Sequence, residues 1–321
     1  MRFSVIKGLH FKSQHCIIIN MLKRPAKTPE LWEERNMMKK LSIAMLSMVL
    51  AGSMLLTGCG GGNTEQTTTD ESTDSATTET AGTEGGVLRM GTNATFPPYE
   101  YVDENNEVAG IDADIAAAIA DKLGMELEIT DMAFDSLIPA LQSDTIDIVL
   151  AGMTVDPERA ESVNFTDSYA TGVQVVIVPE GSDIAAVENE DGEMEVDLTG
   201  KNIGVQTGTT GDLYCTDDYG QEFVKQFDNG PLAVAALLNG QVDCVVIDNE
   251  PAKNYVAANE GLKILDTAYA NEDYAAALAK DDTELYEQVN TAIQELKEDG
   301  TIASIIEKYI PAEGSSEDTA A

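Results

Sequence analysis

The stretch FDSLIPALQSDTIDIVLAGMTVDPER (134–159) contains one helix-then-strand unit of an α/β protein and ends on an arginine. DSLIPALQS (135–143) is typical of a short helix, and TIDIVLAG (145–152) is an apolar run that predicts a buried strand. Ligands of parallel α/β sheets bind beyond the carboxyl ends of the strands. The position of Arg159 just past a strand therefore indicates contact with a ligand.

Arg159 is one of only two arginines that follow residue 58, and no histidine follows that residue. Its planar guanidinium can donate two parallel hydrogen bonds to one carboxylate, which favours an anionic ligand group. The alternative is a structural ion pair with Asp156 or Glu158 on the same helical turn. The sequence of this segment alone favours neither the ligand contact nor the ion pair.

The rest of residues 87–313 repeats the alternation of strands and helices, which is typical of an α/β fold with mostly parallel sheets. Two similar series favour two lobes over one large domain. YAAALA (274–279) is a late strand that could carry the chain back to the first lobe. The other predicted strands are 87–92, 125–130, 171–178, 202–206 and 242–248, and the other predicted helices are 111–124, 231–240 and 283–300.

The N-terminal segment predicts export. A basic segment (37–40) precedes an uncharged stretch (41–56), and this stretch is too short for a comfortable membrane span. LTGC (56–59) resembles the lipobox of bacterial lipoproteins. The resemblance implies that Cys59 is the lipid-modified first residue of the mature protein.

These features divide the precursor. Residues 37–58 form a lipoprotein signal peptide, and we expect 1–36 to be a mis-assigned upstream segment that precedes the true translation start. Residues 59–86 form the lipid anchor and a disordered linker, because Gly, Thr, Ser, Asp and Glu bury too little apolar surface to fold. The tail 314–321 has the same composition. We expect a protein held by its lipid at the extracytoplasmic face of a bacterial cell membrane.

The chain is strongly acidic, with a formal net charge of −38. The mature part is more acidic still, because nine of the 19 basic residues precede Cys59. This charge excludes nucleic acid and electrostatic binding to anionic lipids. We expect no cofactor and no metal, since GTTG (208–211) lacks the ending of a nucleotide-binding loop and no calcium-loop series follows Asp112 and Asp114.

Two cysteines, Cys215 and Cys244, fall within the body of the protein. They could form a disulfide in an exported protein. However, VDCVVID (242–248) predicts a buried strand, which favours two buried thiols.

The ends of the predicted strands supply a set of candidate ligand-binding residues. The set contains one cation, one anion, two aromatic rings and several amide or hydroxyl groups, which suits a small zwitterion. Some of these residues could instead have a purely structural role: Phe96 and Phe134 could be core residues, and Asp248 could cap a helix that starts near Pro251. The candidates are Asn93, Phe96, Phe134, Gly152, Thr154, Arg159, Gln206, Thr210 and Asp248.

Five motifs follow one another in a characteristic order across residues 87–313. They are GTNATFPPYEY (91–101), AGIDADIAAAIADKLG (109–124), FDSLIPALQSDTIDIVLAGMTVDPERAESVNFTDSY (134–169), GVQTGTTGD (204–212) and ALLNGQVDCVVIDNEPA (236–252). This series resembles the polar amino-acid-binding proteins of ABC importers, the group called extracellular solute-binding protein family 3.

The resemblance implies a two-lobed periplasmic-binding-protein fold (type 2), with a ligand cleft between the lobes. Lobe 1 would consist of residues 87–171 and 277–313, and lobe 2 of 172–276. Two hinge strands would cross between the lobes near 170–176 and 272–277. A monomer that delivers an amino acid to an ABC permease in the membrane is the implied function.

The same resemblance assigns roles at the two ends of the ligand. Arg159 would hold the ligand α-carboxylate, together with the backbone N–H groups of Thr154 and Thr210. Asp248 and the carbonyl of Gly152 would take the α-ammonium. Because both ends of a zwitterion lose hydration in the cleft, both need charged partners.

The side chain of the ligand would lie between Phe96 and Phe134, with Asn93 and Gln206 at its far end. Family members that bind cationic amino acids often have an acidic residue at the position of Asn93. Two neutral amides therefore favour a polar, uncharged ligand such as glutamine, although other carboxylates could still serve a cation.

Two alternatives belong to other functional classes. Relatives such as the cyclohexadienyl dehydratases are enzymes on this fold, but the mature chain has no histidine and no added acid in its motifs. A surface adhesin would use the outer surface and leave no motif. We therefore expect a binding protein without catalytic residues.

Overall fold

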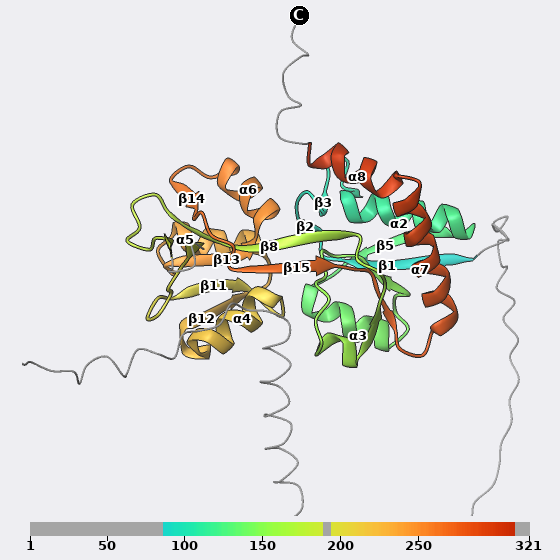
Figure 1. Ribbon diagram of the computed structural model, residues 1–321, viewed down its shortest axis with the longest axis horizontal. Coiled ribbons are helices and arrows are strands. Elements are labelled where there is room, and N and C mark those ends of the chain that lie inside the picture. Colours follow the sequence, from blue (N-terminus) through green and yellow to red (C-terminus); the bar gives the residue numbers. More distant parts are fainter. Residues whose placement is uncertain (1–85, 189–193, 312–321) are drawn as a thin grey trace, which may run out of the picture. The chain divides into compact units, whose positions relative to one another are not determined.

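The structure is a computed structural model that describes residues 86–188 and 194–311. The described residues all belong to one compact unit, and they are the coloured part of Figure 1. The predicted upstream segment, signal peptide, lipidated Cys59 and C-terminal tail lie outside the described residues. In the described part, no helix is long and apolar enough to cross a membrane.

The first sheet consists of β1 (Val87–Thr92), β5 (Glu126–Asp131), β6 (Ile148–Val149), β7 (Val163–Phe165) and β16 (Ala277–Ala279). Its strand order is β5-β1-β6-β16-β7, in which β1, β5 and β6 are parallel and β16 is antiparallel to both neighbours. Figure 1 shows α3 on the opposite side of this sheet from α2 and α8. The helices of this part are α2 (Ile111–Leu123), η1 (Phe134–Ser136), α3 (Leu137–Gln142), η2 (Arg159–Glu161), α7 (Thr283–Glu298) and α8 (Thr301–Tyr309).

The second sheet consists of β8 (Ala170–Pro179), β11 (Ile203–Gln206), β12 (Val224–Phe227), β13 (Cys244–Asp248), β14 (Leu262–Ile264) and β15 (Ala270–Tyr274). Its order is β12-β11-β13-β8-β14, and β15 also pairs with β8. The strands β11, β12 and β13 are parallel, whereas β8 is antiparallel to its partners. The helices here are α4 (Thr210–Tyr219), η3 (Gln221–Phe223), α5 (Gly230–Leu238) and α6 (Asn249–Ala258).

Two small antiparallel sheets complete the fold. One consists of β2 (Thr95–Phe96), β3 (Glu100–Val102) and β4 (Val108–Ala109), and the other of β9 (Val187–Glu188) and β10 (Met194–Glu195). The first of them follows β1 directly and places two aromatic residues, Phe96 and Tyr99, in the core.

The two larger sheets define two lobes, and the chain passes between them twice. It leaves the first sheet after β7 and enters the second at β8, and it returns from β15 to β16. β8 and β15 run side by side as an antiparallel pair that begins with Ala170 opposite Tyr274 (Figure 1). The two expected hinge strands are therefore adjacent and hydrogen-bonded. The single late strand expected over 274–279 is wrong, because β15 and β16 belong to different sheets.

Gly124 ends α2, as expected, with a left-handed φ of 65°. The start of α5 depends on a residue that was not predicted, Asn229, whose side chain accepts a hydrogen bond from the Leu232 N–H. The buried face of α7 contains Val289 and Ile293, as its 3.6-residue period predicts.

The strand expected over 145–152 is shorter than predicted. Only Ile148 and Val149 form β6, because the chain turns away at Gly152, which has a φ of 50°. The N–H of Gly152 donates to Asp112 Oδ2 at 2.7 Å instead of continuing the ladder. This turn carries Thr154 and Arg159 out over the edge of the sheet.

Cys215 and Cys244 are both buried in the second lobe, within a cluster that includes Val205 and Val246. No disulfide joins them in the described residues. The expectation of buried thiols is confirmed.

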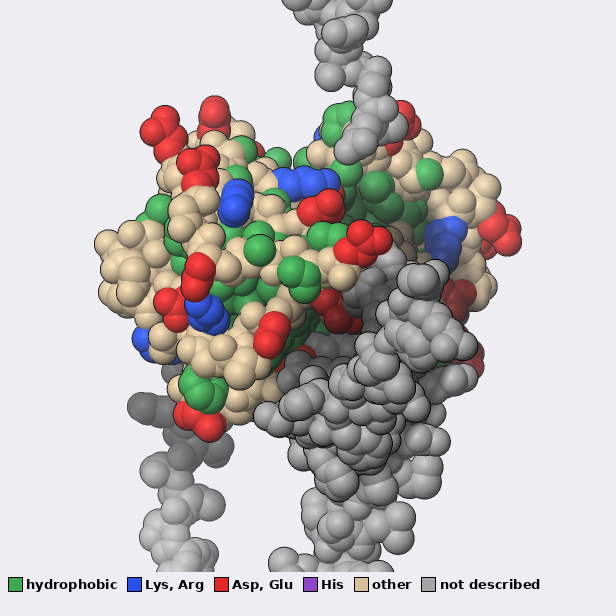
Figure 2. Space-filling view, turned by 60° about the vertical axis from the view of Figure 1, so that its left-hand side comes forward, with side chains coloured by type: hydrophobic (Ala, Val, Ile, Leu, Met, Phe, Trp, Pro, Cys, Tyr) green, Lys and Arg blue, Asp and Glu red, His purple; other side chains and the backbone are tan. Residues whose placement is uncertain are grey.

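On the face drawn in Figure 2, acidic side chains are spread over the surface rather than gathered in one place. A solvated acidic surface accounts for most of the negative charge. The unusual carboxylates are the buried ones. They include Glu100, Asp112, Asp248 and Glu272, whereas Arg159 is the only buried cation among the described residues.

Candidate functional site

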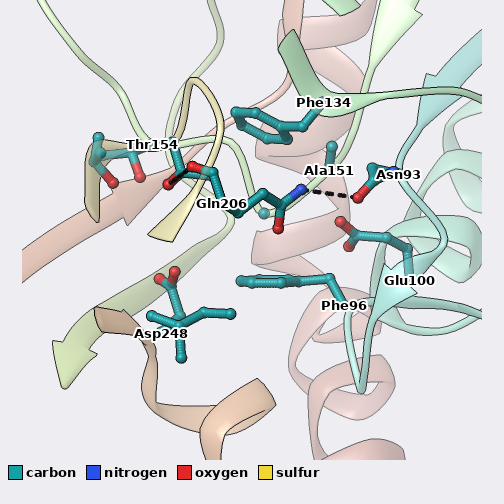
Figure 3. Close-up of a pocket in the computed structure, with 12 residues that line it drawn as sticks. Asn93, Phe96, Glu100, Phe134, Ala151, Thr154, Gln206 and Asp248 are labelled. Atoms are coloured by element: carbon teal, nitrogen blue, oxygen red, sulfur yellow. Dashed lines mark hydrogen bonds between the residues drawn. The ribbon is translucent and has the colours of Figure 1, made fainter. Parts of the chain in front are cut away.

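A cavity with about 390 Å³ of empty space, partly open to solvent, lies between the two sheets (Figure 3). Eight of the nine residues predicted from strand ends line it: Asn93, Phe96, Phe134, Gly152, Thr154, Gln206, Thr210 and Asp248. The other lining residues are Glu100, Ala151, Thr209 and Ile247.

The parallel strands explain why residues so distant in sequence meet here. Asn93 follows β1, and Ala151 lies just beyond β6. Gln206 and Asp248 end β11 and β13 in the second sheet. The carboxyl ends of parallel strands share one edge of a sheet, so the two edges together form the walls of the cavity.

Arg159 is buried, with 8% of its surface exposed. Its backbone N–H donates to Asp156 Oδ1 at 3.0 Å. Its guanidinium donates to two carbonyl oxygens at 3.0 Å, that of Thr154 through Nη1 and that of Gly208 through Nη2. It forms no ion pair among the described residues. The alternative of an ion pair with Asp156 or Glu158 is therefore wrong.

Arg159 does not itself line the cavity, but it lies directly behind the wall. Its guanidinium carbon is 5.3 Å from the centre of the Phe134 ring, and both Phe134 and Thr154 line the cavity. A guanidinium has five N–H donors, and the described residues accept from two of them. Burial lowers the pKa of Arg159, whereas the charges of Asp156 and Glu272 raise it. The result is a charged group with spare donors beside the cavity.

Two backbone N–H groups complete this side of the cavity. Thr210 is the first residue of α4, so its N–H has no partner within the helix. Within the described residues, the N–H groups of Thr154 and Thr210 make no hydrogen bond. Gly208, in the turn before α4, has a φ of 74° that directs its carbonyl to Arg159. The site therefore has donors for an anion at one end.

Asp248 lies at the opposite wall and is 7% exposed. It occupies the N-cap position of α6, but its side chain makes no capping hydrogen bond. Instead it accepts from Gln174 Nε2 at 2.7 Å and from the hydroxyl of Tyr274. The capping alternative is therefore wrong. Burial, followed by the charge of Glu272, raises the pKa of Asp248 well above its usual range, which indicates that a cationic partner would stabilise the ionised form.

Two aromatic rings lie on opposite sides of the cavity (Figure 3). Phe96 is buried and belongs to the core, whereas Phe134 is half-buried. Phe96 therefore belongs to the core and also lines the cavity. A Cβ added at Gly152 would lie 2.9 Å from the Phe96 ring, so this glycine is needed for the approach of the ring.

Asn93 and Gln206 meet at the far end of the cavity. Gln206 Nε2 donates to Asn93 Oδ1 at 3.0 Å, across the space between the two sheets (Figure 3). Asn93 Nδ2 in turn donates to the carbonyl of Met132 at 2.8 Å. Both amides are buried, and each uses the other as a partner.

Two buried carboxyl groups near this end were not among the predicted residues. Glu100, on β3, lines the cavity and is 1% exposed. It shares a hydrogen bond with Asp112, which also accepts from the N–H of Gly152 and from the hydroxyl of Tyr169. The signal that could have revealed Glu100 is its place between Tyr99 and Tyr101, in an otherwise aromatic stretch.

Both carboxyl groups have raised pKa values. Burial is the main cause for Glu100, and the neighbouring Asp112 raises its pKa further. Burial raises the pKa of Asp112 to about 6, although the hydrogen bonds from Gly152, Tyr169 and Glu100 lower it. The pair therefore retains a proton more readily than exposed carboxyl groups do.

Gln174 on β8 and Glu272 on β15 were also missed. Both side chains are buried and hydrogen-bond to each other beside Asp248. Strand alternation could have indicated Glu272, since it shares a face of β15 with the buried Tyr274. In the described residues, no group of histidine, cysteine or carboxylate side chains is suited to a metal ion.

The fold and the cavity define a two-lobed α/β binding protein, in which Arg159 lies behind one wall of the cleft and Asp248 forms part of another. The model of the bacterial extracellular solute-binding proteins, family 3, matches residues 88–312. The chain belongs to this family, as its motifs indicated. The family resemblance and the two-lobed fold expected from the sequence are confirmed.

A probable histidine-binding protein of Neisseria gonorrhoeae is 33% identical over 285 residues, which cover 87% of this chain and 98% of that protein. Among solved structures, an ancestral arginine-binding protein is 43% identical to this chain. Its glutamine-bound structure has a TM-score of 0.64 and covers 70% of this chain and 97% of the ancestral one. Its arginine-bound structure also has a TM-score of 0.64, with coverages of 71% and 99%. The names of these relatives describe amino-acid-binding proteins.

Proposed function

We propose that this protein is the extracytoplasmic receptor of an ABC importer and binds an L-α-amino acid by closure of its two lobes. The observation that carries the proposal is the pair of charged groups on opposite sides of one cavity. Arg159, from the first lobe, lies behind one wall, and Asp248, from the second lobe, forms part of the other. A ligand that contacts both would favour the closed arrangement over the open one.

The α-carboxylate of the ligand would lie towards Arg159. The unused guanidinium donors and the N–H groups of Thr154 and Thr210 support this orientation. The α-ammonium would lie between Asp248 and the carbonyl of Gly152. Charge-assisted hydrogen bonds contribute roughly 1.5–3 kcal/mol each, so a few of them reach the roughly 8 kcal/mol of a micromolar complex.

The far end of the cavity favours a cationic side chain. Glu100 is a buried carboxyl group in the lining, and its Oε2 has no donor among the described residues. A guanidinium or ammonium group would supply that donor and stabilise the ionised carboxylate. The names of the arginine- and histidine-binding relatives agree with a basic amino acid.

The uncharged ligand expected from Asn93 and Gln206 is the second candidate. The amide pair at the far end could exchange its mutual hydrogen bond for bonds to a glutamine side chain. A relative bound to glutamine supports this possibility. The two candidates differ in whether Glu100 must be ionised when the ligand binds.

We also propose that the protein is anchored by a lipid on Cys59. The support is the order of the signal features that end in LTGC (56–59). In a bacterial host, mass spectrometry of the N-terminal peptide should detect a lipid on Cys59, and Cys59→Ala should release the protein from membranes. An unmodified cysteine at this position would contradict the anchor.

Isothermal titration calorimetry of residues 60–321 against the twenty L-amino acids tests the main proposal. We expect micromolar binding of arginine or another basic amino acid, and weaker or no binding of apolar ones. Absence of heat with all twenty would contradict the proposal and favour one of the two alternatives, an adhesin or an enzyme. Turnover of prephenate or arogenate would instead indicate a cyclohexadienyl-dehydratase-like enzyme.

A further inference from the structure

Glu272 is a buried carboxylate on the second crossing strand, with 6% of its surface exposed. β15 pairs with β8 and places Glu272 opposite Gly172. The side chain therefore lies where the chain passes between the lobes, close to both Arg159 and Asp248. Its charge raises the pKa of each of these two groups.

The groups around Glu272 are hydrogen-bond donors. Its Oε2 accepts from Thr154 Oγ1 and from Gln174 Nε2, each at 3.0 Å. The hydroxyl of Tyr214, on α4, also faces this carboxylate, and burial together with the charge of Glu272 raises the pKa of Tyr214. Because Oε2 accepts these hydrogen bonds, it determines the orientation of the two donors that are directed to it.

This determines what Thr154 can offer to the cavity. A threonine hydroxyl has one proton and two lone pairs. Because that proton is directed to Glu272, only the acceptor side of the hydroxyl remains available to a ligand. An oxygen acceptor suits an ammonium group and repels a carboxylate.

The same carboxylate determines how Gln174 is used. A side-chain amide has two N–H donors, and Gln174 directs Nε2 to both Glu272 and Asp248. Asp248 is held by this contact and by the hydroxyl of Tyr274. Glu272 therefore orients the Thr154 hydroxyl directly and the Asp248 carboxylate through Gln174. Both of these acceptors line the cleft.

The backbone keeps these side chains in register. Thr154 and Tyr274 form an isolated bridge, with Val155 N donating to Asp273 O at 2.9 Å and Ala275 N donating to Met153 O at 3.1 Å. The segment that carries Thr154 is thereby attached to the strand that carries Glu272.

We propose that Glu272 is a positioning residue that makes one end of the cleft selective for the α-ammonium group of the ligand, by fixing Thr154 as an acceptor and Gln174 against Asp248. This inference rests on the proposed function. It assigns the orientation of the ligand to a residue that does not line the cavity.

The test is Glu272→Gln in the mature protein, with three ligands measured by calorimetry. The ligands are arginine, 5-guanidinopentanoate, which lacks the ammonium group, and argininamide, which lacks the carboxylate. In the unaltered protein, arginine should bind more tightly than both analogues. In the variant, the ratio of the affinity for arginine to the affinity for 5-guanidinopentanoate should fall by about 10-fold or more. The reason is that the amide of the new glutamine can donate to the Thr154 oxygen, which then directs its own proton into the cleft. The preference over argininamide should change by less than about 3-fold.

Two controls keep the test specific. Thr154→Val removes the hydroxyl that Glu272 orients. The double variant, Thr154→Val with Glu272→Gln, should therefore lose no more of the preference for arginine over 5-guanidinopentanoate than Glu272→Gln alone. Glu104→Gln, at an exposed position, should change neither preference. Equal losses for both analogues, or a lower melting temperature with unchanged preferences, would show a merely structural role and overturn the inference. Failure of the unaltered protein to bind any amino acid would instead contradict the proposed function.

Discussion

Arg159 Nη2, in the first lobe, donates a hydrogen bond to the carbonyl oxygen of Gly208, in the second lobe, at 3.0 Å. Gly208 lies in the turn that leads into α4, so the arginine contacts the turn that precedes Thr210, whose N–H makes no hydrogen bond among the described residues. The guanidinium thus joins the lobes and also leaves donors for a ligand. The position of this one group links closure of the cleft to binding.

Arg159→Ala should lower the affinity for the ligand by roughly 100-fold or more, because both the carboxylate partner and the contact to Gly208 are lost. Calorimetry measures the affinity. The matched control is Arg89→Ala, which removes a partly exposed ion pair with Asp147, and neither of these residues lines the cavity. That variant should change affinity by less than about 2-fold, since such pairs contribute little. Similar losses in both variants would contradict a specific role for Arg159.

Glu100→Gln should distinguish the two candidate ligands. For a cationic ligand, we expect a loss of affinity of about 10-fold or more, because an amide cannot neutralise a buried guanidinium. The affinity for glutamine should change by less than about 3-fold. Competition titrations with arginine and glutamine measure the ratio. An unchanged ratio would support the uncharged ligand.

The stability of the ligand-free protein should depend on pH through Asp112. Its ordinary pKa is 3.8, and burial raises the pKa to about 6 in the folded protein. The folded state therefore holds this proton more tightly than the unfolded state does. The resulting stabilisation is fully present below about pH 4 and is lost as the pH rises through about 6, with a magnitude of at most ~3 kcal/mol.

Urea unfolding between pH 4 and pH 7 measures this effect when the protein is compared with Asp112→Asn. The difference in the free energy of unfolding, unaltered protein minus variant, should fall as the pH rises. The comparison removes the contribution of the many surface carboxylates, which titrate in both proteins. A difference that is constant with pH would show that Asp112 does not retain its proton.

Gly152→Ala should destabilise the protein by ~1–3 kcal/mol, because the residue has a φ of 50° and an added Cβ would lie 2.9 Å from the Phe96 ring. The affinity should fall as well, since Phe96 would be displaced from the cavity wall. Gly181→Ala is the control, because nothing lies within 4 Å of its added Cβ. Its free energy of unfolding should change by no more than about 0.5 kcal/mol. Thermal unfolding and calorimetry provide both quantities.

The fold was predictable because its signals are local. Gly124 ends α2 and Asn229 caps α5 through preferences of individual residues. The end of β6 at Val149 was not predictable from the apolar run. Its apolar continuation, Leu150 and Ala151, is buried in the turn outside the ladder, and burial in a turn and in a strand leaves the same sequence pattern.

The sequence by itself determined the family, the two series of strands and helices, and eight of the residues that line the cavity, because the ends of parallel strands can be located from the chain alone. It also indicated Arg159 by its rarity. Only the tertiary structure decided that Arg159 donates to carbonyl oxygens instead of forming an ion pair, and that Glu100 and Glu272 are buried beside the cavity. The pKa of a carboxyl group and the direction of a hydrogen bond depend on neighbours from distant parts of the chain, which no local pattern records.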